Sequence, residues 1–109
     1  MITRDLILQT TGEYDLAIVT KISLPHLELP RISSLDPCVN LLELNLSNNS
    51  IKQISGLSCL KKLRRLDLSC NAINTISDDG LNSNRALEFV TLEVNKISDL
   101  EDLKVFMGH

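Results

Sequence analysis

Few side chains in this 109-residue sequence could act as nucleophiles, bases or metal ligands. The histidines are His26 and His109, and the cysteines are Cys38, Cys59 and Cys70. A nucleophilic cysteine needs a base within hydrogen-bonding reach, and a zinc site needs cysteines or histidines at short, paired spacings. The sequence contains no such spacing and no glycine-rich loop of the kind that binds phosphate. We therefore predict that the protein is not an enzyme and that it uses no cofactor and no metal.

The sequence has one basic run, Lys61-Lys62-Leu63-Arg64-Arg65. Such a run can contact phosphates or serve as a nuclear localisation signal. However, no aromatic residue alternates with it to stack on bases. The formal net charge of the chain is −3, which gives no general attraction to nucleic acid or to acidic membranes. These features favour a protein partner over nucleic acid.

The cysteines and the apolar segments indicate the compartment. The three cysteines are scattered and odd in number, which is typical of a reducing compartment. No stretch approaches the ~20 apolar residues of a membrane-spanning helix, and the first nine residues lack the apolar run of a signal peptide. We predict a cytoplasmic protein that is not embedded in a membrane, with a nuclear or ciliary location as alternatives.

The leucines reveal an internal repeat that must position any functional side chains. The pattern L-x-x-L-x-L-x-x-N-x-I-x-x-I begins at Leu41, Leu63 and Leu87, in steps of 22 and then 24 residues. A degenerate copy begins at Val19 and has Leu27 where the others have asparagine. Because side chains alternate along a strand, the L-x-L pair predicts a short strand with both leucines facing inward.

The asparagine of each copy follows that strand, where the chain must turn. A buried amide can bond to backbone groups of the turn that no sheet partner reaches. We therefore predict a ladder of Asn49, Asn71 and Asn95 beside a parallel sheet. The segments that return to the next strand, such as 54–60, are too short for a long helix, so we expect 3₁₀-helix or one to two α-helical turns there.

These features predict a single domain over 1–109, an α/β repeat fold in the form of a short solenoid with a parallel sheet on its concave side. Residues 1–18 form an N-terminal cap, 19–40 the degenerate repeat, and 41–62, 63–86 and 87–106 the full repeats. A small amphipathic helix is expected over residues 3–10, capped by Thr3 and terminated by Gly12. Leu6, Ile7 and Leu8 would cover the first repeat.

The other end of the stack is expected to be open. A repeat array exposes its core leucines unless a cap covers them, and the sequence stops a few residues after the last repeat. We predict that the protein self-associates through this uncapped C-terminal end, or that it is a truncated form or splice product.

The repeat resembles the 22-residue cytoplasmic leucine-rich repeat family, which includes a regulatory subunit of protein phosphatase 1 and the spliceosomal A-prime protein. The resemblance implies a right-handed solenoid that acts as a protein–protein interaction module or scaffold and binds a partner on its concave face. Two alternatives stay open: a ribonucleoprotein component, and a regulatory subunit of an enzyme such as a phosphatase.

The outward positions of the strands form rows across the concave face, with neighbours about 4.8 Å apart. The first row is Lys21, Glu43, Arg65 and Phe89, and the second row is Ser23, Asn45, Asp67 and Thr91. The predicted partner-binding residues come from these rows and from the position after the last strand: Lys21, Glu43, Asn45, Arg65, Asp67, Phe89, Thr91 and Glu93.

Two of these predictions have alternatives. The alternating charges of the first row could form cross-strand ion pairs that serve only stability. Phe89 is expected to anchor a partner, unless a loop or the C-terminal segment covers it.

The repeat also predicts where the thiols lie. Cys38 takes a core position, Cys59 should be partly buried, and Cys70 should be accessible. His26 and Cys70 fall in one outward row but two strands apart, about 10 Å, which is too far for a nucleophile–base pair.

Overall fold

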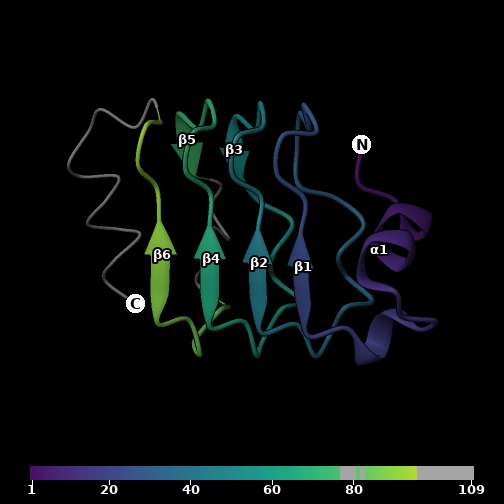
Figure 1. The fold of residues 1–109 in the computed structure, drawn as a ribbon. Helices are drawn as coiled ribbons and strands as arrows, with labels where there is room; N and C mark the ends of the chain where they lie inside the picture. The colour runs from purple at the N-terminus through teal and green to yellow at the C-terminus, as the bar shows by residue number, and fades with distance from the viewer. Residues whose placement is uncertain (77–80, 82, 96–109) are drawn as a thin grey trace.

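The computed structural model describes residues 1–76, 81 and 83–95. The elements are the helix α1 (Arg4–Thr11), the 3₁₀-helix η1 (Leu16–Ile18) and the strands β1 (Lys21–Ser23), β2 (Glu43–Asn45), β3 (Gln53–Ile54), β4 (Arg65–Asp67), β5 (Thr75–Ile76) and β6 (Phe89–Thr91). β1, β2, β4 and β6 lie side by side in one parallel sheet, and β3 and β5 form a smaller parallel pair (Figure 1). The predicted fold class, a repeat with a parallel sheet and an N-terminal helix, is confirmed.

Each strand of the larger sheet alternates between core and surface as the L-x-L pattern predicts. Leu44 and Leu66, at the strand centres, are 2% exposed and aligned in register. Leu46 and Leu68, just beyond the strands, are fully buried. The core is therefore one continuous aliphatic layer beneath the sheet, and its register fixes which side chains face outward.

The asparagine ladder is present. The Asn49 Oδ1 accepts hydrogen bonds from the backbone N–H groups of Leu27 and Leu29, both at 3.0 Å. Its Nδ2 donates to the Leu24 and Leu46 carbonyls, also at 3.0 Å. Asn71 and Asn95 repeat this arrangement in the next two turns: each Nδ2 donates to carbonyls of its own and the preceding repeat, and each Oδ1 accepts a hydrogen bond from one backbone N–H, that of Ile51 or Ile73. Each amide thus connects its own turn to the turn of the preceding repeat.

α1 covers the first repeat, beside β1 in Figure 1. The helix begins at Arg4 because the Thr3 Oγ1 accepts a hydrogen bond from the Leu6 N–H at 3.1 Å. It ends at Gly12, whose φ of 75° is easily adopted only without a side chain. Ile7 is fully buried, and Leu6 and Leu8 are half-buried against the core. The predicted cap helix is confirmed to within one residue at each end.

The returning segments differ from the prediction. Residues 55–62 contain no helix; they form consecutive turns in which Leu60 N–H donates to the Leu57 carbonyl and Leu63 N–H to the Leu60 carbonyl. Leu57, Leu60 and Leu63, which are spaced three residues apart, are all buried, so these turns fill the core without a helix. The expectation of 3₁₀ or α-helical turns there was wrong, and β3 and β5 were not anticipated.

Asn84 occupies a core position in the equivalent turn of the next repeat. Leu60 stands in that position one repeat earlier, and both residues are fully buried. The Asn84 Nδ2 donates to the Leu57 and Leu60 carbonyls at 2.8 and 2.9 Å, and its Oδ1 has no partner among the described residues. A buried amide in an aliphatic position is therefore tolerated because it ties two turns together.

A row of left-handed residues follows the strands of the larger sheet. His26, Asn48, Cys70 and Val94 have φ between 56° and 59°. Asparagine adopts this conformation readily, whereas a β-branched valine is strained in it. The repeat therefore imposes the turn geometry on whichever residue occupies the position.

The thiols follow the prediction in two cases of three. Cys38 is buried and Cys70 is exposed, but Cys59, predicted to be partly buried, is exposed. It lies between Leu57 and Leu60, the two buried ends of a turn, and so projects outward.

The prediction of an open C-terminal end concerns mainly residues 96–109, which lie outside the described residues. Within the described residues, no helix is long and apolar enough to cross a membrane.

Candidate functional site

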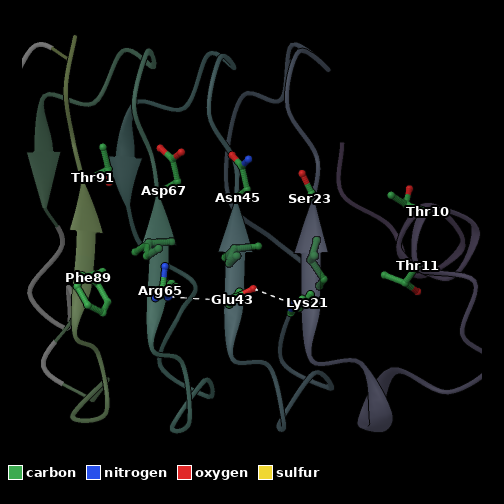
Figure 2. Close-up of a pocket in the computed structure, with 13 residues that line it drawn as sticks. Thr10, Thr11, Lys21, Ser23, Glu43, Asn45, Arg65, Asp67, Phe89 and Thr91 are labelled. Carbon is green, nitrogen blue, oxygen red and sulfur yellow. Dashed lines mark ion pairs between the residues drawn. The ribbon is translucent and has the colours of Figure 1, made fainter.

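The concave face of the larger sheet forms a shallow groove with a volume of about 560 Å³ (Figure 2). The first and second rows supply most of its lining, and α1 adds Thr10 and Thr11 at one end. Of the predicted residues, Lys21, Glu43, Asn45, Arg65, Asp67, Phe89 and Thr91 line the groove. Glu93 is exposed just beyond β6 and is not among the lining residues.

The first row is held in register by the sheet, so that Lys21, Glu43 and Arg65 lie opposite one another on β1, β2 and β4. The Lys21 Nζ is 3.5 Å from the Glu43 Oε2, and the Arg65 Nε is 3.6 Å from the Glu43 Oε1 (Figure 2). These are the cross-strand ion pairs that the alternating charges of the first row predict. All three side chains are at least 40% exposed, so each pair contributes at most about 1 kcal/mol to stability.

Phe89 ends the first row and faces outward. Its position on β6 pairs with Arg65 on β4, and the Arg65 guanidinium carbon lies over the ring, 4.7 Å from its centroid. The residue remains 54% exposed. Among the described residues no loop covers Phe89; the other alternative to an exposed anchor, cover by the C-terminal segment, concerns residues 96–109, which lie outside the described residues. The contact is a cation–π interaction that holds the guanidinium against one face of the ring.

The second row is polar and partly engaged with the turns that follow the strands. The Asp67 Oδ1 accepts hydrogen bonds from the backbone N–H of Ser69 at 3.0 Å and from its hydroxyl at 2.7 Å. The Asn45 Oδ1 accepts one from the Ser47 N–H at 2.9 Å. The other oxygen of Asp67 and the amide nitrogen of Asn45 have no partner among the described residues. These atoms can bond to a ligand in the groove.

The basic run is divided between two surfaces, as the repeat predicts. Arg65 alone lines the groove; Lys61, Lys62 and Arg64 are exposed elsewhere. The Lys62 Nζ donates to the Asn40 Oδ1 at 2.7 Å, and Arg64 forms an ion pair with Glu88 at 3.0 Å. The run therefore does not act as one continuous basic patch.

Sequence reasoning missed Thr10 and Thr11 as groove residues, because the angle at which α1 meets the sheet is not encoded in the repeat. The helix prediction ended at residue 10, and nothing in its pattern indicated which exposed side chains turn toward the strands. Within the described residues, no group of three or more His, Cys, Asp or Glu is placed to hold a metal ion. The groove offers charged, hydroxyl and aromatic contacts to a ligand.

Comparison with known proteins identifies the repeat. The family model for leucine-rich repeats in two copies matches residues 39–83, which include β2, β3, β4 and β5. No curated protein matches the chain. Domains of this kind are generally protein-interaction modules and typically non-catalytic. The match covers fewer than half of the 109 residues, and the same strand register continues on either side of it, into β1 and β6.

Proposed function

We propose that the protein binds another protein in the concave groove and acts as an interaction module or scaffold. The observation that carries the proposal is Phe89, an aromatic side chain more than half exposed on a regular sheet and flanked by charged neighbours. Aromatic and arginine side chains dominate the binding energy of protein interfaces, and a rigid support lowers the entropy lost on binding. The eight residues predicted above remain the proposed contact set.

Affinity capture from cell extract with quantitative mass spectrometry tests the proposal. The test variant combines Phe89→Ala with Arg65→Glu. The matched control combines Tyr14→Ala with Arg64→Glu, which makes the same kinds of change at exposed residues outside the groove lining. We expect the test variant to lose the proteins that the wild type and the control capture, with circular dichroism and melting temperature near those of the wild type. Equal capture by all three proteins would refute binding in the groove.

We also propose a finer placement, in the 22-residue cytoplasmic subfamily. The support is the step of 22 residues between β1, β2 and β4. At the N-terminus, Ile2-Thr3, Leu6-Ile7 and Thr11-Gly12-Glu13-Tyr14 resemble the start of leucine-rich-repeat-containing protein 61. A cytoplasmic location follows from this placement and is proposed with it.

The ribonucleoprotein and phosphatase-regulator alternatives rest on the resemblance alone. Fluorescence polarisation with a labelled RNA distinguishes the first from the proposal. An RNA component would bind through exposed cations such as Lys61 and Lys62, and its affinity would fall steeply between low and moderate salt. The absence of such salt-dependent RNA binding, together with protein capture that depends on Phe89, would favour the protein-binding proposal.

A further inference from the structure

We infer that the groove selects a protein segment in which a carboxylate side chain lies beside an apolar one, the carboxylate bonding to Arg65 and the apolar group packing on Phe89. This inference rests on the proposed function and names the chemistry of its partner.

Arg65 is already oriented for such a contact. Its guanidinium lies over the Phe89 ring, and its Nε edge faces Glu43. The two terminal nitrogens have no partner among the described residues, and the side chain is 62% exposed. A planar guanidinium with its outer edge free binds a carboxylate through two parallel hydrogen bonds. Because the ring and Glu43 already restrict the side chain, less entropy is lost when that pair forms.

The charged side chains of the first row are not fully balanced: they include one more cation than anion. Lys21 and Arg65 are both cationic, and they share the single carboxylate of Glu43, one oxygen each. The row therefore carries a formal charge of +1. A carboxylate from a partner balances the charge of the row, whereas a phosphate group, with nearly two negative charges, exceeds it and is repelled more strongly by Glu43 and Asp67. The arrangement favours an acidic protein side chain over a phosphorylated one.

Phe89 and Asp67 restrict where the rest of the partner lies. The Phe89 ring is 54% exposed and offers an apolar surface directly beside the guanidinium. Asp67 lies two residues further along β4 than Arg65, or about 6.6 Å at the usual rise per residue. Its free oxygen repels a carboxylate and attracts a donor. The preferred segment thus has an acidic residue next to an apolar one, with a basic or amide side chain toward the second row.

Selection of random dodecapeptides displayed on phage tests the inference. The full chain is immobilised as wild type, as Arg65→Glu, as Phe89→Ala and as Arg64→Glu. The last is the matched control, because it makes the same charge change one residue away and outside the groove lining. Thermal melting of each variant confirms that the immobilised protein is folded.

We expect wild type and Arg64→Glu to enrich peptides that carry Asp or Glu beside an apolar residue. The enriched peptides should bind Arg65→Glu and Phe89→Ala about tenfold more weakly or worse, and Arg65→Glu should enrich basic peptides instead. Peptides that lose affinity for Phe89→Ala but show no acidic preference would overturn the inference and leave the proposed function standing. Peptides that bind all four proteins equally, or no enrichment at all, would count against both.

Discussion

Replacement of Asn71 by alanine removes one step of the asparagine ladder. The Asn71 Oδ1 accepts a hydrogen bond from the Ile51 N–H at 3.1 Å. Its Nδ2 lies within 2.9–3.2 Å of the carbonyls of Leu46, Leu68 and Ser69. Alanine provides none of these contacts, so the turns of two successive repeats lose their side-chain connection.

The expected magnitude follows from which backbone groups lose every partner. Each of the three carbonyls keeps another donor after the substitution, from Asn49, Asn95 or the backbone of Asn48. The Ile51 N–H keeps none among the bonds described, and Ile51 is fully buried. One orphaned buried donor costs about 1–3 kcal/mol. We therefore expect Asn71→Ala to lower the free energy of unfolding by about 2 kcal/mol, a fall in Tm of roughly 10 °C for a domain of this size.

Urea denaturation followed by circular dichroism measures this difference. Asn74→Ala is the matched control, because Asn74 lies in the same repeat, is exposed, and makes no side-chain hydrogen bond among the described residues. It should change the free energy of unfolding by less than about 0.5 kcal/mol. Asn82, a natural choice from the sequence because it lies outside the repeat pattern, falls outside the described residues. Equal denaturation midpoints for Asn71→Ala and Asn74→Ala would refute the ladder.

The Asn71→Asp variant distinguishes the contribution of the amide oxygen, which accepts a hydrogen bond, from that of the amide nitrogen, which donates. Asn71→Asp keeps an acceptor for the Ile51 N–H but places carboxylate oxygen against three carbonyl oxygens. We expect it to be at least as destabilising as Asn71→Ala at neutral pH. Because the carbonyl oxygens would raise the pKa of the new carboxyl group in the folded state, part of that loss should be recovered as pH falls toward about 4, where the group is protonated. Wild-type stability in Asn71→Asp would mean that the donor side of the amide contributes nothing.

Four further measurements probe other parts of the chain. Gly56→Ala should cost clearly more stability in urea denaturation than Gly12→Ala: both glycines have a φ of 75°, but only at Gly56 would a Cβ lie 2.9 Å from a backbone oxygen, that of Ile32. Burial raises the pKa of the Cys38 thiol above its ordinary value of 9.0. The unfolded state therefore releases this proton at a lower pH than the folded state does. The free energy of unfolding should fall as pH rises beyond about 9, and this fall should be absent in Cys38→Ala. A thiol-reactive reagent should modify Cys59 in the folded protein but not Cys38. Sedimentation across a range of concentrations tests the predicted self-association, and a strictly monomeric species at high concentration would refute it.

The repeat made the sheet and its facing side chains predictable. Leu44 and Leu66 had to share a face, because each strand alternates and each step of 22 residues preserves the register. The same register predicts that Glu43 and Arg65 lie opposite each other. The ladder of Asn49 and Asn71 followed from the need to satisfy buried turn groups. At positions that recur in every repeat, the structure could therefore be predicted from the pattern alone.

The remaining features depend on single residues that break the repeat or on contacts between elements. Asparagine is not a residue type that indicates an aliphatic core position, so Asn84 was not predicted to be buried, although aligning Leu81 with Leu57 places it opposite the buried Leu60. The exposure of Cys59 depends on turn geometry that a pattern of leucines does not distinguish from a short helix. The stacking of Arg65 on Phe89 requires side-chain rotamers, which the spacing of residues does not specify.

The spacing of the paired strands also has a consequence for how the chain folds. Lys21 pairs with Glu43, Glu43 with Arg65, and Arg65 with Phe89, so each strand finds its neighbour 22 or 24 residues away. A parallel sheet often requires distant segments to meet, which slows folding. Here each pairing closes a loop of similar, modest length, and adding a strand extends structure already formed. As the polypeptide leaves the ribosome, α1 and β1 emerge first, and each later strand can join the growing edge once its own repeat has been synthesised.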